Sequence, residues 1–335
     1  MEEINLIRGA KVLVDTCGNV QAGEDVLIVA DTDVFLNLRL AKVVAMAALE
    51  RGAEVTVALM TPRSAHGQEP PAPIAAAMLR ADVIYAPTTY SIFHTDARRE
   101  AVKAGARFLN MVDYDEQMLV AGGLMADFFA MRPVAERIGE VFTRGRRAEV
   151  TSPLGTRVVM DITGRSGFPQ PGMSREPGTT SSPPDIEASV GPLEGTAEGV
   201  IIVDGSIPHP DIGVIEEPIE LSVSKGRIVE IKGGKQAQAL RKLLEGTGED
   251  SVYVMAELGI GLNPQARICG RMLEDEGVYG SVHFGFGDNR SLGGVTKAPM
   301  HLDAVILRPT VAVDGVTILR EGEFMEGKEG REALR

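Results

Sequence analysis

Tryptophan is absent from this 335-residue chain, and aromatic residues make up only 4% of it. This scarcity disfavours a platform on which bases or sugars would stack. Basic residues are also in the minority, because 34 Lys and Arg stand against 47 Asp and Glu and give a formal net charge of −13. No basic run interrupts the acidic surplus, so we expect neither nucleic acid nor an anionic membrane as a partner.

Cysteine is scarce as well, since Cys17 and Cys269 are the two thiols of the chain. Long apolar runs are missing, because no stretch reaches the ~18 residues typical of a membrane-spanning helix. The first residues, MEEINLIRG, lack the cationic and apolar blocks of a signal peptide. These absences predict a soluble, cytoplasmic protein.

The composition is that of a globular protein, with 44% hydrophobic and 24% charged residues, and the length suits about two domains of ~150 residues. In the first half, short apolar and β-branched runs such as DVLIVAD and DVIYAP alternate with segments of helical period such as FLNLRLAKVVAMAALERG. Apolar strands between helices are typical of a parallel sheet covered on both faces. We therefore predict a doubly wound α/β domain over residues 1–146.

After Arg146 the pattern changes to hairpin-like alternation, beginning with AEVTSPLGTRVVMDITG. Further strands are expected in GVIIVDGSI, IELSVSKGRIVEIKGG and SVYVMAELGIG, and one helix in QAQALRKLLEG. The sequence thus predicts an α+β domain over residues 147–335, rich in antiparallel pairs, and the candidate metal ligands described below all lie in it. The fold class is α/β for the whole chain.

Residues 165–192 are too rich in Pro, Gly, Ser and Thr for a regular element. The simplest interpretation is a linker. Since a loop of this length within a compact domain is uncommon unless it is functional or mobile, the segment is alternatively the wall of a site.

Among the five histidines, His301 has the most informative neighbour, because Asp303 follows it by two places in an expected strand. Residues i and i+2 of a strand point to the same face, so this pair can bind one cation through a nitrogen and an oxygen. His283 precedes Phe-Gly-Phe-Gly, which is typical of a strand end with close backbone approach. The pair of His94 and Asp96 is better explained by capping of the helix that follows.

Glu257 interrupts the apolar strand VYVMAELGIG. An unpaired, ionised carboxylate in such a place is costly unless a cation or a strong donor compensates its charge. Metal ligation and a buried ion pair with Arg267 or Arg271 explain Glu257 equally well on chemistry alone.

The successive segments PPDIEASVGP, AELGIGLNPQA, GSVHFGFGDN and MHLDAVI resemble the thermophilic metallo-aminopeptidase family of aminopeptidases T and S. In that family two Glu, two His and one Asp bind two divalent metals. The resemblance covers about residues 180–310 and implies zinc, manganese, cobalt or magnesium ions. Matched position by position, it places the ligands on Glu187, Glu257, His283, His301 and Asp303.

The family's catalytic tyrosine, seven places after the first histidine, is replaced here by Arg290. The resemblance therefore implies that Arg290 stabilises the tetrahedral intermediate by its charge, since arginine does not act as a base near neutrality. Glu276 is our candidate for the group that takes the proton.

Two other phrases, GLNPQARICG and DNRSLGG, resemble the 2,5-dihydroxypyridine 5,6-dioxygenases, a second branch of the same fold. Those enzymes bind a single Fe(II) through two histidines and one aspartate. Glu257 stands at the position of the first of these histidines, and His283 stands where that branch lacks a ligand.

We therefore predict a metal-dependent hydrolase, aminopeptidase-like, that uses metal-activated water on a peptide or other amide bond of a small molecule or short peptide. One alternative is a mononuclear Fe(II) ring-cleaving dioxygenase that acts on a hydroxylated N-heterocycle. The other is a non-catalytic, metal-stabilised oligomer. The resemblance and the edge strands of the second domain predict a homodimer or higher homo-oligomer.

Overall fold

The computed structural model describes residues 3–32 and 35–325, and the chain divides into two compact units. Unit 1 is Met1–Phe128 together with Pro171–Pro184, and unit 2 is Phe129–Gln170 together with Asp185–Arg335. The chain therefore passes from one unit to the other after residues 128, 170 and 184.

Unit 1 is built on a parallel sheet, as the alternating pattern predicts. The strand order is β2-β1-β3-β4-β8, and every neighbouring pair is parallel. The strands are β1 (Asp25–Asp31), β2 (Glu54–Met60), β3 (Val83–Ala86), β4 (Arg107–Asn110) and β8 (Thr180–Ser181). The helices are α1 (Glu3–Lys11), α2 (Phe35–Glu50), α3 (Ala72–Met78), α4 (Asp96–Lys103) and α5 (Glu116–Val120), with the π-helix η1 (Val12–Cys17) and the 3₁₀ turn η2 (Gly123–Met125).

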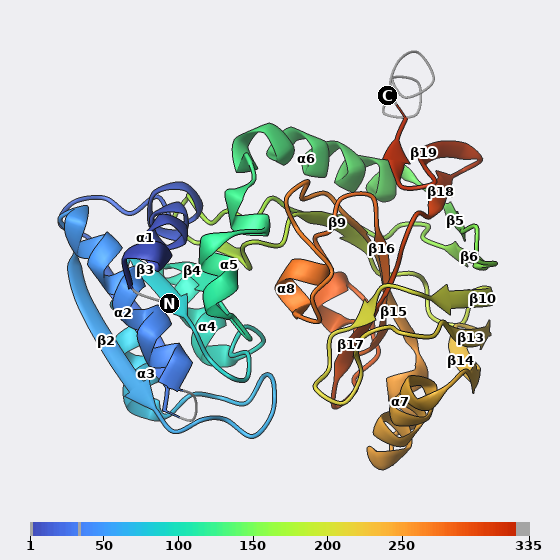
Figure 1. Ribbon diagram of the computed structural model, residues 1–335, viewed down its shortest axis with the longest axis horizontal. Coiled ribbons are helices and arrows are strands. Elements are labelled where there is room, and N and C mark those ends of the chain that lie inside the picture. Colours follow the sequence, from blue (N-terminus) through green and yellow to red (C-terminus); the bar gives the residue numbers. More distant parts are fainter. Residues whose placement is uncertain (1–2, 33–34, 326–335) are drawn as a thin grey trace. The chain divides into compact units, whose positions relative to one another are not determined.

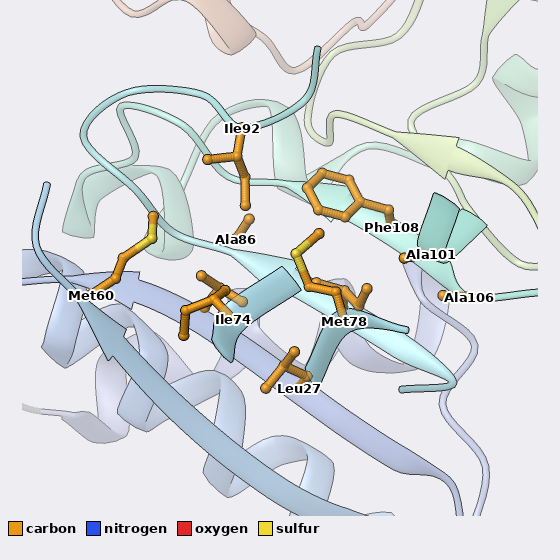
Figure 2. Packing of buried hydrophobic residues seen from close by; sticks show 11 residues of the cluster. Leu27, Met60, Ile74, Met78, Ala86, Ile92, Ala101, Ala106 and Phe108 are labelled. Carbon is orange, nitrogen blue, oxygen red and sulfur yellow. The ribbon is translucent and has the colours of Figure 1, made fainter. Parts of the chain in front are cut away.

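The core of unit 1 explains why its central strands are apolar along nearly their whole length. In β1 every residue after Asp25 is buried, so both faces of the strand are covered. On one face, Leu27 and Phe108 pack with Ile74 and Met78 of α3 (Figure 2). Such two-sided burial is typical of a parallel sheet.

Unit 2 contains two antiparallel sheets (Figure 1). The eight-stranded sheet has the order β14-β13-β10-β6-β5-β18-β19-β20. Its strands are β5 (Arg147–Thr151), β6 (Arg157–Asp161), β10 (Glu198–Val203), β13 (Ile219–Ser224), β14 (Arg227–Lys232), β18 (Thr310–Val313), β19 (Val316–Arg320) and β20 (Glu323–Phe324).

The seven-stranded sheet of unit 2 has the order β12-β11-β17-β16-β15-β9-β7. Its strands are β7 (Gly167–Gln170), β9 (Glu187–Val190), β11 (Ser206–Ile207), β12 (Gly213–Val214), β15 (Met255–Gly261), β16 (Val282–Gly287) and β17 (His301–Ile306). The helical segments of this part of the chain are α6 (Phe128–Arg144), α7 (Lys235–Gly246) and α8 (Met272–Asp275), with η3 (Asp250–Tyr253) and η4 (Arg290–Leu292). The predicted layout, a parallel sheet followed by antiparallel sheets, is confirmed.

The division of the chain differs from the boundary expected near Arg146. Helix α6 belongs almost entirely to unit 2, and residues 171–184 return to unit 1, where β8 pairs with β4. The proline-rich segment 165–192 is thus not a linker, since it contributes strands to both units. Its short strand β7 includes Pro169 and lies at a sheet edge, where a residue without an N–H is tolerated.

No single helix within the described residues is long and apolar enough to cross a membrane. One bent pair of consecutive helical segments, Glu116–Met125 and Phe128–Arg144, meets the criteria of length and composition only when both are counted together.

Candidate metal centre

The five residues predicted as metal ligands lie on four neighbouring strands of the seven-stranded sheet of unit 2. These strands, β9, β15, β16 and β17, carry respectively Glu187, Glu257, His283, and the pair His301 and Asp303. Strand alternation and the antiparallel registers place all five side chains on one face of the sheet.

A glycine lies directly across the ladder from every one of these five residues. The pairs are Glu187 with Gly261, His283 with Gly259, Glu257 and Asp303 with Gly285, and His301 with Gly287. At Gly285 a Cβ atom would come within 2.5 Å of His301 Nε2. The glycines thus leave the face free of side chains that would fill the space between the carboxylates and imidazoles.

Glu257 occupies the middle of the group. Its Oε2 lies 3.0 Å from His301 Nε2, and its Oε1 lies 3.9 Å from His283 Nε2. Glu187 Oε2 lies 3.0 Å from His283 Nε2, and Asp303 Oδ1 lies 3.3 Å from His301 Nε2. The donor atoms fall into two groups, each within 4.8 Å of one another, with Glu257 shared: Glu187, Glu257 and His283, and then Glu257, His301 and Asp303.

The centre fits divalent cations. Glu187, Glu257, His283 and Asp303 are all buried, yet Glu187 Oε2 and Asp303 Oδ1 have no hydrogen-bond partner among the described residues. Buried polar atoms are normally satisfied, so orphaned carboxylate oxygens that face imidazole nitrogens indicate a missing partner. Imidazole and carboxylate ligands suit zinc, manganese and iron.

Burial and neighbouring charges perturb the pKa values of the centre. Burial alone would lower the pKa of His283, but the Glu187 carboxylate outweighs it and raises that pKa well above the usual value. Asp303 does the same for the pKa of His301. Burial alone would raise the pKa of Glu257, but the neighbouring imidazoles of His283 and His301 lower it. A cation would replace the protons that these imidazoles otherwise hold.

Two further carboxyl groups, Asp185 and Glu276, lie within the electrostatic reach of the centre. Burial raises the pKa of each well above its usual value, and the charge of Glu187 adds to this for Asp185, as that of Asp303 does for Glu276. Asp185 Oδ1 and Glu276 Oε1 have no hydrogen-bond partner within the described residues. Glu276, the candidate proton acceptor, thus lies within reach of the charges of the centre, which together with burial raise its pKa.

Arg290, the other predicted catalytic residue, begins η4, and its side chain is 56% exposed. Its guanidinium pairs with Asp288, at 2.7 Å between Nη2 and Oδ2. No contact among the described residues joins it to the predicted ligands, so its catalytic role stays a prediction. The alternative for Glu257, an ion pair with Arg267 or Arg271, is not formed, because its ion pairs within the described residues are with the two histidines.

Sequence reasoning missed the groups that orient the predicted ligands. Gln170 of β7 donates from Nε2 to Glu187 Oε1 at 3.0 Å, and the carbonyl of Asp288 lies 2.7 Å from His301 Nδ1. Gln170 lies in the proline-rich segment, whose composition gave no signal of a strand. Asp185, two places before Glu187, is a buried acid that the sequence offered no reason to single out.

The other histidines make local contacts. His66 Nδ1 accepts a hydrogen bond from the Ser91 N–H, and His209 Nδ1 accepts one from the Asp211 N–H. Beside His94, Thr95 is the N-cap of α4 and accepts from the Arg98 N–H at 3.2 Å. The capping interpretation of that segment is confirmed.

Fold and site together define an enzyme of mixed α/β architecture with a carboxylate and histidine centre on an antiparallel sheet. The family profile described as "NicX: 2,5-dihydroxypyridine 5,6-dioxygenase" matches residues 10–326, and the chain belongs to this family. A curated relative, the 2,5-dihydroxypyridine 5,6-dioxygenase of Pseudomonas putida KT2440, is 26% identical over 253 residues, which are 72% of this chain and 71% of that protein.

Two solved structures share the fold. The 2,5-dihydroxypyridine dioxygenase from Pseudomonas putida KT2440 has a TM-score of 0.83 and 22% identity, covering 99% of this chain and 100% of that one. Wild-type AmpT from Thermus thermophilus has a TM-score of 0.69 and 16% identity, covering 96% and 99%. Both resemblances noted in the sequence are thus supported. The family and its curated relative favour the dioxygenase alternative over the predicted hydrolase, whose support from these comparisons is a likeness of fold.

Proposed function

We propose that this chain is a metal-dependent hydrolase that binds two divalent cations and cleaves a peptide or other amide bond. The observation that carries the proposal is the position of Glu257. Its two oxygens face different histidines, His283 and His301, so one carboxylate belongs to both candidate ligand groups. Two ions held about 3.5–4 Å apart are typical of aminopeptidases and other two-metal enzymes.

The charges of the centre support two ions better than one. Glu187, Glu257 and Asp303 are the three carboxylates among the predicted ligands, and in their ionised forms they supply three negative charges. One divalent cation would leave a negative charge uncompensated in a buried place, which is unfavourable. Two would leave one positive charge, which favours an anionic nucleophile.

Two divalent cations bound here would activate a water molecule and polarise the substrate carbonyl. Glu187 and His283 would hold one cation, His301 and Asp303 the other, and Glu257 would contact both. Glu276, with its raised pKa, would take the proton of the attacking water and return it to the leaving amine. The substrate class is a small molecule or a short peptide.

A second candidate function is ring cleavage of a hydroxylated N-heterocycle by a mononuclear Fe(II) dioxygenase. The match of the family profile along most of the chain favours it. Such enzymes hold iron on a face of two histidines and one carboxylate with open positions. Each ligand group of this chain has one histidine and two carboxylates instead, and we therefore place this candidate second.

One experiment separates the two functions. The purified full chain would be analysed for bound metals, then loaded with zinc, manganese, cobalt, magnesium or Fe(II) and supplied with amino-acid amides, short peptides and 2,5-dihydroxypyridine. Amine release and oxygen consumption would be followed in parallel. We expect two ions per chain and amine release without oxygen uptake. One iron per chain, with oxygen uptake and no amide cleavage under any metal, would overturn the hydrolase.

A cytoplasmic location and assembly as a homodimer or higher homo-oligomer are part of the same proposal. The formal net charge of −13 and the edge strands β14 and β12 are compatible with it. Light scattering at micromolar concentration would test the assembly, and a monomeric mass would contradict it.

A further inference from the structure

The loop that joins β16 to β17 holds His301 through its backbone. The Asp288 carbonyl lies 2.7 Å from His301 Nδ1, and a carbonyl oxygen can only accept, so the hydrogen bond requires a proton on Nδ1. That leaves Nε2, which faces Glu257 and Asp303, as the atom able to bind a metal. Asp288 is fixed in turn, because its N–H donates to the Met300 carbonyl at 2.9 Å.

The centre of this loop is the buried amide side chain of Asn289. Its Oδ1 accepts from the Thr296 N–H at 2.8 Å, and its backbone carbonyl accepts from the Gly294 N–H at 3.0 Å. A Cβ atom at Gly294 would lie 2.1 Å from Asn289 Cγ. The loop is therefore wrapped closely around one amide group.

Glu194, from the segment after β9, anchors this arrangement. Its Oε1 accepts from Asn289 Nδ2 and from the Val295 N–H, both at 2.8 Å. Its Oε2 pairs with Arg165, whose other terminal nitrogen donates to the Gly293 carbonyl. The Arg165 side chain is only 10% exposed, so this ion pair is largely shielded from solvent.

We propose that Glu194 is a positioning residue of the metal centre, acting through Asn289 to fix the loop whose Asp288 carbonyl orients His301. Glu194 touches none of the predicted ligands itself. The inference rests on the proposed function only in taking His301 as a metal ligand. Residues that orient metal ligands typically change metal affinity about 10–100-fold when they are removed.

The test compares Glu194→Ala, Glu194→Gln and Asn289→Asp with Glu245→Ala, an exposed glutamate of α7 that serves as the control. Glutamine keeps an oxygen that accepts from Asn289 and Val295. Asn289→Asp removes the donor from the other side of the same hydrogen bond, which provides a second variant if Glu194→Ala does not fold. Circular dichroism and the thermal midpoint verify the fold of each full-length protein.

Two readouts follow. Titration of the metal-free protein with Co²⁺, monitored by visible absorption, gives affinity and ligand geometry. Without metal, the hydrogen-bonded Nδ1–H resonance of His301 is observed in histidine-labelled protein and assigned by its loss in His301→Ala, since the chain has only five histidines.

We expect Glu194→Ala and Asn289→Asp to bind Co²⁺ about 10–100-fold more weakly, with an altered spectrum and a lost or broadened His301 resonance. The control should stay within about threefold of the wild type, and Glu194→Gln, which keeps an acceptor for Asn289 but loses the charge that pairs with Arg165, should lie between the wild type and Glu194→Ala. Unchanged affinity, spectrum and resonance in folded Glu194→Ala or Asn289→Asp would overturn the inference alone. A wild type that binds no metal, with its His301 resonance still dependent on Glu194, would instead overturn the proposed function and leave the positioning role established.

Discussion

Gly259 lies directly across the β15–β16 ladder from His283, and a Cβ atom there would come within 1.9 Å of the imidazole Nε2. Position 259 requires glycine for a steric reason, because the side chain of His283 occupies the space that a Cβ atom would need. Gly259→Ala should therefore push the imidazole away from Glu187 and Glu257 although every predicted ligand is kept. We expect at least a tenfold loss of metal affinity, with overpacking that destabilises the protein by about 1–3 kcal/mol.

Metal content after dialysis against a defined zinc buffer and the urea unfolding midpoint measure these effects. The matched control is Gly246→Ala, because a Cβ atom at this last residue of α7 would meet nothing within 4 Å. A Gly259→Ala protein with wild-type metal content would show that His283 does not need its present position to bind metal.

Asp303→Asn tests the second ligand group without a change of size. The amide loses the charge that Asp303 Oδ1 presents beside His301 Nε2, so we expect no more than one bound ion per chain and little change in circular dichroism. A ligand at 100 times its dissociation constant stabilises a protein by about 2.7 kcal/mol. The zinc-dependent rise in thermal midpoint should accordingly shrink in the variant.

Differential scanning calorimetry with and without zinc measures that rise. Asp211→Asn, at a side chain that is 78% exposed, is the control. Two tightly bound ions in Asp303→Asn would remove this residue from the ligand set.

Metal-free and metal-loaded protein should respond to pH in opposite directions. The charge of Glu187 raises the pKa of His283, and the charge of Asp303 raises the pKa of His301, in both cases against the effect of burial. A group whose folded pKa lies above its unfolded value of about 6.5 stabilises the fold fully below that pH, and the contribution is lost as pH rises through the folded pKa. The metal-free protein should therefore become less stable above about pH 6.5.

Metal binding reverses this trend, because a metal and a proton compete for the same imidazole nitrogen. The affinity for zinc should rise from about pH 6.5 upwards, with release of protons on binding. Thermal midpoints in EDTA and in excess zinc, measured between about pH 5.5 and 8.5 around the ordinary histidine pKa, test both signs. If the thermal midpoints in EDTA and in zinc changed with pH in the same way, the histidines would not be the ligands of the metal.

The sequence pattern was sufficient to predict the parallel and antiparallel halves, and the resemblance to the metallo-aminopeptidases completed the set of five candidate ligands that converge in the structure. His301 and Asp303 were identifiable because strand alternation puts i and i+2 on one face, and Glu257 because a carboxylate interrupts an apolar strand. The opposing glycines and the anchor Glu194 were not predictable, since both depend on strand register and loop contacts that no local pattern specifies. The return of residues 171–184 to unit 1 was not predictable either, because β8 has only two residues and is defined by its pairing with β4.

Glu257→His decides between the two metal chemistries at a single position. In a two-ion hydrolase, imidazole cannot contact both cations as a carboxylate does, so we expect one ion per chain and a loss of amide hydrolysis of about 100-fold or more, the size typical of removing one electrostatic stabiliser. In a dioxygenase, the same change would build a face of two histidines and one aspartate with His301 and Asp303, which suits Fe(II).

Metal analysis, amine release and oxygen uptake with 2,5-dihydroxypyridine measure the two outcomes, and Glu257→Gln controls for the loss of charge alone. Histidine adds a nitrogen ligand that glutamine lacks. Iron-dependent oxygen uptake in Glu257→His but not in Glu257→Gln would therefore demonstrate that His301 and Asp303 are placed to hold Fe(II) once a second histidine is supplied. Oxygen uptake already present in the iron-loaded wild type, and unchanged by either substitution, would contradict the role of Glu257 as the shared ligand of a hydrolytic centre.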